Sequence, residues 1–92
     1  MTKNNPQHQE ETDVLEAKIN ENGLILYNDD VNTFDHVINS LVSICKHDPI
    51  QAEQCAILVH YKGKCTVKTG EYEKLKVQCT QLLDAGLSAE LY

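Results

Sequence analysis

Three polar residues in a row, Asn28-Asp29-Asp30, follow the short apolar segment 23–27, which favours a buried strand. A capped amphipathic helix is predicted from Asn32 onward, so the amide and the two carboxylates lie on a turn between a strand and a helix. Such a group of oxygen acceptors can cap the helix or bind a cation. Because Asp and Asn are ordinary cap and turn residues, the turn alone leaves both interpretations open.

Another polar residue that could take part in binding or catalysis is His60, which follows the apolar segment 57–59 near the end of a predicted helix. An isolated histidine in such a place is commonly a satisfied core or surface residue. If it faces the turn at residues 28–30, however, amide, carboxylate and imidazole together can bind a small ammonium group.

The chain shows no pattern of a catalytic site. It has no serine in a nucleophile-elbow context, no Gly-rich phosphate loop and no H-E-x-x-H helix. Cys55 and His60 are five residues apart on one predicted helix, which does not put them on the same face. We therefore expect a protein without enzymatic activity and without a cofactor.

Four cysteines lie at small apolar positions of the predicted helices and strand, and no two of them form a C-x-x-C pair: Cys45, Cys55, Cys65 and Cys79. Reduced thiols in the core are the favoured interpretation. The sharper alternative is a zinc site, although the paired spacing of structural zinc sites is missing. Its ligands would come from Cys45, His47, Cys55, His60 and Cys65.

The composition of the chain argues against two further classes of protein, nucleic-acid-binding modules and membrane proteins. The net charge is -6 and arginine is absent, which argues against a nucleic-acid-binding module. No segment is long and apolar enough to span a bilayer, and the N-terminus lacks the order of a signal peptide. We expect a cytoplasmic, monomeric protein that does not bind membranes.

The chain of 92 residues accommodates one domain. Residues 1–13 hold a single aliphatic residue, Met1, and residues 14–22 are ambiguous, so we predict a flexible N-terminal extension over 1–22. The folded domain is predicted over residues 23–92.

The order of elements in this domain predicts an α+β fold, with three helices on one face of a three-stranded, mostly antiparallel sheet. The predicted strands are 23–27, 64–67 and 87–91. The first helix is capped by Asn32 and ends near His47. The second begins at Asp48-Pro49 and ends at Gly63. The third begins at Thr69 or Gly70 and ends at Gly86.

Together, the N-D-D turn, the helix after it and the segment 58–64, which reads L-V-H-Y-K-G-K, resemble the ClpS family of Clp protease adaptors. That family carries an N-D-D turn and a later V-H-Y-x-G-K segment. The correspondence runs without a gap from Leu24 to Lys64 and continues more weakly through 71–76 to the last strand.

The resemblance implies an adaptor that binds proteins by a free N-terminal Leu, Phe, Tyr or Trp and delivers them to a ClpA- or ClpC-type AAA+ unfoldase. Residues 1–22 would be the tail needed for substrate transfer, and Glu71 and Lys76 would face the unfoldase. By position, Asn28, Asp29 and His60 would hold the substrate's α-amino group. The pocket for its first side chain would consist of Asp30, Asn32, Phe34, Val37, Ala56, Val59 and Leu87.

The chemistry of an α-amino group suits those residues. Its pKa is about 8, so it is mostly protonated at neutral pH and carries three donors. A neutral His60 can accept one of these hydrogen bonds, whereas a protonated one repels the ammonium. We predict that binding weakens as the pH falls through the titration of this histidine, and a flat affinity between pH 5 and 8 would exclude the role of His60.

The chain departs from the family pattern at the pocket. The family's Tyr-Thr-Pro-Met after N-D-D is Val-Asn-Thr-Phe here, ending in Phe34, and a second pocket methionine is Ala56. The preference among first residues is therefore open. Two other functions also stay open. One is a diverged regulator that docks on the unfoldase without reading N-termini, and the other is a generic α+β interaction module.

Overall fold

The protein's structure, a computed structural model, describes residues 21–92. The predicted extension over 1–22 lies almost wholly outside the described residues. Three strands and three helices follow one another in the predicted order. They are β1 (Asn22–Tyr27), α2 (Phe34–Ile44), α3 (Pro49–Lys62), β2 (Lys64–Gly70), α4 (Tyr72–Asp84) and β3 (Ser88–Leu91).

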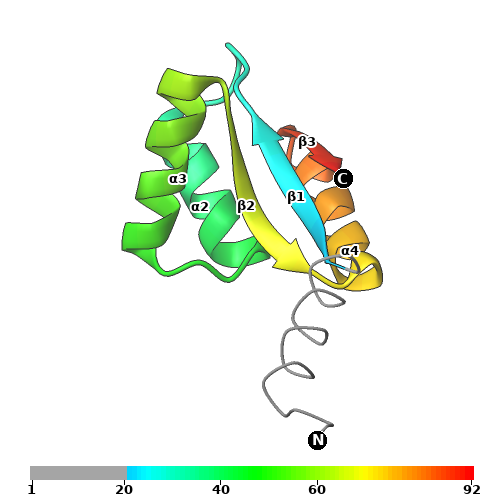
Figure 1. Ribbon diagram of the computed structural model, residues 1–92. Coiled ribbons are helices and arrows are strands. Elements are labelled where there is room, and N and C mark those ends of the chain that lie inside the picture. The colour runs from blue at the N-terminus through cyan, green and yellow to red at the C-terminus, as the bar shows by residue number, and fades with distance from the viewer. Residues whose placement is uncertain (1–20) are drawn as a thin grey trace, which may run out of the picture.

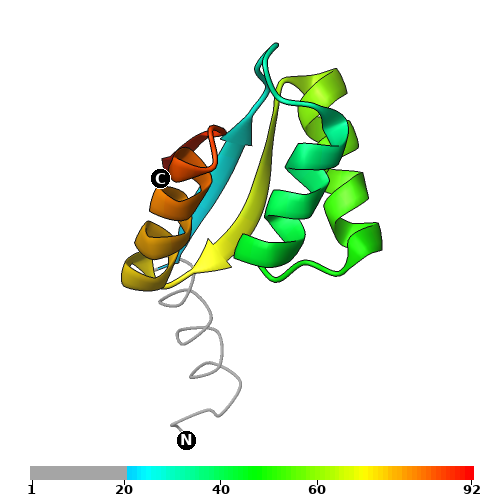
Figure 2. The same cartoon turned by 180° about the vertical axis from the view of Figure 1, so that it is seen from behind.

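The strands form one antiparallel sheet in the order β2-β1-β3, so the first strand lies at its centre. Helices α2 and α4 lie behind the sheet in Figure 1, and α3 packs against α2 and β2. The view from behind shows α2 and α4 on the near side, to the right and left of β1 and β2, with α3 behind α2 (Figure 2). This arrangement confirms the predicted α+β fold and brings the end of β1 next to α2 and α3.

The core lies between the sheet and the helices, and leucines from β1, α2 and α4 fill most of it. All four cysteines are free thiols, as predicted. Cys45 and Cys79 are buried, and Cys55 and Cys65 pack against the core. Burial raises the pKa of Cys45 to about 11, and burial together with the neighbouring Cys65 raises that of Cys55 to about 12. These groups are therefore protonated at neutral pH.

The boundaries of α3 follow the predicted signals. The Asp48 carboxylate caps the helix by accepting a hydrogen bond from the backbone N–H of Gln51 at 2.9 Å, and Pro49 occupies the first turn. At the other end, Gly63 has a φ of 91°, a left-handed conformation that favours glycine.

Three other predicted boundaries are wrong. Thr33, and not Asn32, caps α2, because the side chain of Asn32 is bound elsewhere. This helix ends at Ile44 rather than near His47, where Lys46 turns the chain with a φ of 62°.

The third helix also begins later than predicted. Strand β2 continues to Gly70 because β1 begins at Asn22, one residue before its predicted start, and pairs with it there. Helix α4 consequently begins at Tyr72. Within residues 21–92, no helix has the length and apolar character needed to cross a membrane.

Candidate functional site

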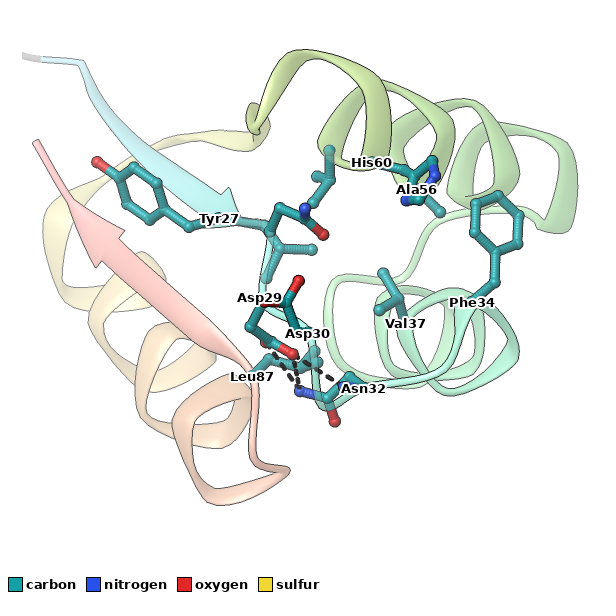
Figure 3. Close-up of a pocket in the computed structure, with 12 residues that line it drawn as sticks. Tyr27, Asp29, Asp30, Asn32, Phe34, Val37, Ala56, His60 and Leu87 are labelled. Atoms are coloured by element: carbon teal, nitrogen blue, oxygen red, sulfur yellow. Dashed lines mark hydrogen bonds between the residues drawn. The ribbon is translucent and has the colours of Figure 1, made fainter.

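A pocket of about 330 Å³ opens where the end of β1 and the following turn meet α2 and α3 (Figure 3). Two of the lining residues, Leu26 and Tyr27, were not predicted for the site. The structure also brings together at this pocket every residue predicted to contact a substrate: Asn28, Asp29, Asp30, Asn32, Phe34, Val37, Ala56, Val59, His60 and Leu87.

The turn is organised by the carboxylate of Asp29. Its Oδ1 accepts hydrogen bonds from the backbone N–H groups of Val31 at 3.0 Å and Asn32 at 2.9 Å. The side-chain amide of Asn32 donates to the same carboxylate and also to the carbonyl of Gly86 at 2.8 Å. Two acceptors for one NH₂ group fix the orientation of this amide. The turn is thereby tied to the connection between α4 and β3.

A second attachment joins the turn to the end of α3. The backbone N–H of Asn28 donates to the carbonyl of Gly63 at 2.9 Å, and the N–H of Gly63 donates to the carbonyl of Val59 at 3.0 Å. The last turn of α3, which carries His60, is thus held beside the turn of residues 28–32, called the acidic turn below. A ring nitrogen of His36 bonds the carbonyl of Ala85 at 2.8 Å and anchors the start of α2 to the connection between α4 and β3.

Asp29 carries a negative charge at neutral pH. Its pKa is lowered from the ordinary 3.8, chiefly by the hydrogen bond from the backbone N–H of Asn32. Partial burial opposes this effect, and the Asn32 side chain, the N–H of Val31 and the nearby His36 add to it. Within the described chain, Oδ2 accepts a hydrogen bond from the Asn32 amide alone. Because a carboxylate oxygen can accept two, this atom keeps an open acceptor position.

Other polar side chains of the pocket keep their hydrogen-bonding capacity as well. Asn28, Asp30 and His60 are exposed, and none of their side chains makes a hydrogen bond within residues 21–92. His60 contacts Tyr61 edge to face, with ring centroids 4.8 Å apart. Figure 3 shows Asp29 and Asp30 on one side of the pocket and His60 on the other. The pocket therefore combines two carboxylates, an amide and an imidazole.

The remaining wall is apolar. Ala56 and Val59 of α3 and Leu87 after α4 are at most 4 % exposed, and Val37 is half-buried. Phe34, at the start of α2, is 41 % exposed and lies at the end of the pocket near Ala56 (Figure 3). Such a site suits a ligand with a cationic group beside a hydrophobic one.

Two predicted site residues lie elsewhere. Glu71 is the residue before α4 and Lys76 lies within that helix, and neither lines the pocket. Both side chains are exposed. The alternative zinc site finds no support, because in the part of the chain that the structure describes no three His, Cys, Asp or Glu residues come together to hold a metal ion.

Sequence reasoning missed three contributors to the site. Leu26 and Tyr27 directly precede the acidic turn, so the end of the predicted strand was a signal for them. Gly86, whose carbonyl holds Asn32, lies 54 residues away from it along the chain. No local pattern indicates such a contact.

Comparisons with known proteins agree on one family. Residues 17–90 match the family described as ATP-dependent Clp protease adaptor protein ClpS. The ClpS adapter protein of Thermosynechococcus vestitus is 38% identical over 66 residues, covering 71% of this chain and 70% of that protein. The ClpS adapter protein of Nitratidesulfovibrio vulgaris is 34% identical over 56 residues, covering 59% of this chain and 56% of that protein.

A solved structure has the same fold. Agrobacterium tumefaciens ClpS2, bound to L-phenylalaninamide, matches with a TM-score of 0.76, over 79% of this chain and 95% of that one. The sequence identity is 16%, so this match concerns the fold alone.

Proposed function

Because the chain belongs to the ClpS family of ATP-dependent Clp protease adaptors, we propose that it recognises N-degrons: it binds proteins by a free N-terminal residue with a large hydrophobic side chain. It then delivers them to an AAA+ unfoldase of the ClpA or ClpC type. Members of this family act as adaptors and not as enzymes. The observation that carries the proposal is the pocket, in which unsatisfied acceptors lie beside a buried apolar wall.

The α-ammonium group of the substrate binds at the polar side of this pocket. It has three N–H donors, and the pocket lining offers three acceptors for them: the amide oxygen of Asn28, the Oδ2 of Asp29 and an unprotonated ring nitrogen of His60. The bond to Asp29 is charge-assisted and therefore stronger than one between neutral groups. An internal peptide segment has no ammonium group, so it would leave these acceptors unpaired.

The first side chain of the substrate lies against the apolar wall of Val37, Ala56, Val59 and Leu87. Burying a Leu- or Phe-sized side chain contributes about 1.5–3 kcal/mol. A. tumefaciens ClpS2 supports this assignment, because its ligand, L-phenylalaninamide, carries a free amino group next to a hydrophobic side chain.

Titration of labelled peptides by fluorescence anisotropy tests this function. A peptide beginning with Phe is compared with an N-acetylated copy of the same sequence. Acetylation removes the positive charge and two donors, so we expect the free peptide to bind and the acetylated copy not to bind. Equal binding of the two, or no binding of either, would contradict N-degron recognition.

The unfoldase docks on a separate surface around Glu71 and Lys76. Glu71, directly before α4, and Lys76, within it, are both exposed, and neither lines the pocket, so substrate and unfoldase can be bound together. The double variant Glu71→Ala/Lys76→Ala should lose binding to the unfoldase and keep peptide binding. The variant Asp29→Ala should behave in the opposite way. A protein that regulates the unfoldase without reading N-termini would lose nothing with Asp29→Ala.

A further inference from the structure

Two of the four cysteines lie next to each other outside the pocket. Cys55 belongs to α3 and Cys65 to β2, and neither residue lines the pocket. Both are half-buried free thiols that pack against the same core. We propose that Cys55 and Cys65 are a site of reversible oxidation, at which a disulfide ties α3 to the sheet.

The fold points the two thiols toward each other. Helix α3 and strand β2 are joined by Gly63 alone, so the chain turns back and the two elements lie side by side (Figure 1). The thiol of Cys55 is hydrogen-bonded to the side chain of Cys65. The Cys65 thiol in turn donates to the carbonyl of Thr66 at 3.5 Å. A disulfide forms only between cysteines whose side chains face each other, as these two do.

The other two cysteines are less suited to oxidation. Cys45, which caps the end of α2, is fully buried, and Cys79 of α4 is buried as well. An oxidant in solution has little access to a buried sulfur. The pair of Cys55 and Cys65 therefore combines contact between two thiols with partial exposure.

A small disulfide such as glutathione disulfide can carry out the oxidation in two exchange steps. Cys65 reacts first, because burial raises the pKa of Cys55 to about 12 and keeps it a thiol. The Cys65 thiolate attacks one sulfur of the reagent, the S–S bond of the reagent breaks, and the departing glutathione thiolate takes up the proton that Cys65 gave.

In the second step, Cys55 attacks the sulfur of Cys65 in this mixed disulfide. The bond from Cys65 to glutathione breaks, and the second glutathione thiolate takes up the proton of Cys55. The protein loses two hydrogen atoms and is oxidised by two electrons, while one glutathione disulfide is reduced to two glutathione thiols. An added dithiol reverses the exchange.

The experiment treats the full chain with glutathione disulfide, unfolds it in the presence of iodoacetamide and measures its intact mass. We expect a chain that is lighter by two hydrogen atoms before alkylation and that is alkylated at two of its four cysteines. Peptide mapping should place the bridge between Cys55 and Cys65, and dithiothreitol should restore all four alkylation sites. Oxidation of the urea-unfolded chain should give a mixture of bridges instead.

Three variants separate the two steps. Cys55→Ser should stop at the mixed disulfide and keep one glutathione on Cys65. Cys65→Ser should form neither the mixed disulfide nor a bridge. Cys79→Ala is the matched control, which removes a buried cysteine outside the pair and should form the bridge as the wild type does. Circular dichroism confirms that each variant is folded.

Four results would overturn the proposal: no oxidation of the folded wild type, a bridge that includes Cys45 or Cys79, the same mixture of bridges in the folded and the unfolded chain, or a Cys55→Ser variant that takes up no glutathione. None of these measurements uses a peptide ligand. Their outcome is therefore independent of N-degron recognition, which fails in a different way, when no peptide binds or N-acetylated copies bind equally well.

Discussion

Two connections of this fold use similar residues for different purposes. The first is the acidic turn, residues 28–32, with His60 beside it. The second is the α2–α3 connection, residues 46–48, which includes His47. Each pairs a histidine with an aspartate whose carboxylate accepts a hydrogen bond from the backbone N–H three residues later, that of Asn32 or Gln51.

In the α2–α3 connection, these polar groups serve the fold. His47 is 4 % exposed, and its Nε2 donates to the carbonyl of Val67 at 2.6 Å. The ammonium of Lys68 donates to the carbonyl of Cys45 at 3.1 Å. In the acidic turn, by contrast, an oxygen of Asp29 keeps an open position and His60 stays exposed beside an apolar wall. The Nδ1 of His47 also has no hydrogen-bond partner, but it is buried where a ligand cannot reach it. A polar turn therefore marks a site where the unused hydrogen-bonding capacity is exposed beside buried apolar surface.

The largest expected effect comes from Asp29→Ala. This change removes the charged acceptor and also the hydrogen bonds that order the turn. Charge-assisted hydrogen bonds contribute about 1.5–3 kcal/mol, so peptide affinity should fall by about 10- to 150-fold. Asp35→Ala is the matched control, because Asp35 is exposed and does not line the pocket. Anisotropy titrations measure both. Equal losses of peptide affinity in the two variants would show that the Asp29 carboxylate contributes no more to binding than another surface carboxylate does.

The two histidines should respond in opposite ways to alanine. His47→Ala leaves a buried carbonyl unpaired and a cavity, so the free energy of unfolding should fall by about 2–3 kcal/mol. His60→Ala should change it by less than about 0.5 kcal/mol, since the side chain is exposed, while weakening peptide binding. Urea denaturation and peptide titration separate the two effects. A strongly destabilised His60→Ala protein would show that His60 is structural.

A smaller loss of unfolding free energy is expected for Gly63→Ala. Gly63 ends α3 and accepts a hydrogen bond from the backbone N–H of Asn28 in the acidic turn. Gly63 has a φ of 91°, and an added Cβ has nothing within 4 Å, so the cost is conformational and about 1 kcal/mol. Urea denaturation measures it. A loss of several kcal/mol would instead indicate that the hydrogen bond from Asn28 to Gly63 also breaks.

The smallest effect concerns the pH dependence of stability. The folded-state pKa of Asp29 lies below its ordinary 3.8, chiefly because the backbone N–H of Asn32 donates to the carboxylate. The resulting stabilisation is fully present above pH 3.8 and is lost as the pH falls through the folded-state value. Asp29→Asn keeps an oxygen acceptor without the charge. Urea denaturation from neutral to acidic pH should therefore show a smaller acid-induced loss for this variant than for the wild type, and identical profiles would contradict the assignment.

Much of the fold followed from local signals. The start of α3 at Asp48-Pro49 and its end at Gly63 could be predicted, because helix capping and a left-handed backbone each depend on a single residue type. The cap of α2 did not follow, because Asn32 and Thr33 are both suitable caps. What decides between them is a contact of Asn32 with Gly86, which the sequence cannot indicate.

The candidate site, too, could be predicted from the sequence only in part. The acidic turn and His60 were recognisable from residue types and from the resemblance to the ClpS family. Leu26 and Tyr27 were missed, because which strand residues face the pocket depends on how α2 and α3 pack against β1. The difference between His47 and His60 depends on burial, which the residues next to them in the sequence do not reveal.

The most direct test of the account is an NMR titration of the ¹⁵N-labelled protein with L-phenylalaninamide and, separately, with its N-acetylated form. The account predicts that the free amine shifts the backbone resonances of Val31 and Asn32 and the side-chain amide of Asn32, because these N–H groups bond the carboxylate that receives the ammonium. The acetylated form should leave them unchanged. Equal shifts with both compounds, or shifts confined to α4, would contradict recognition of a free N-terminus at this pocket.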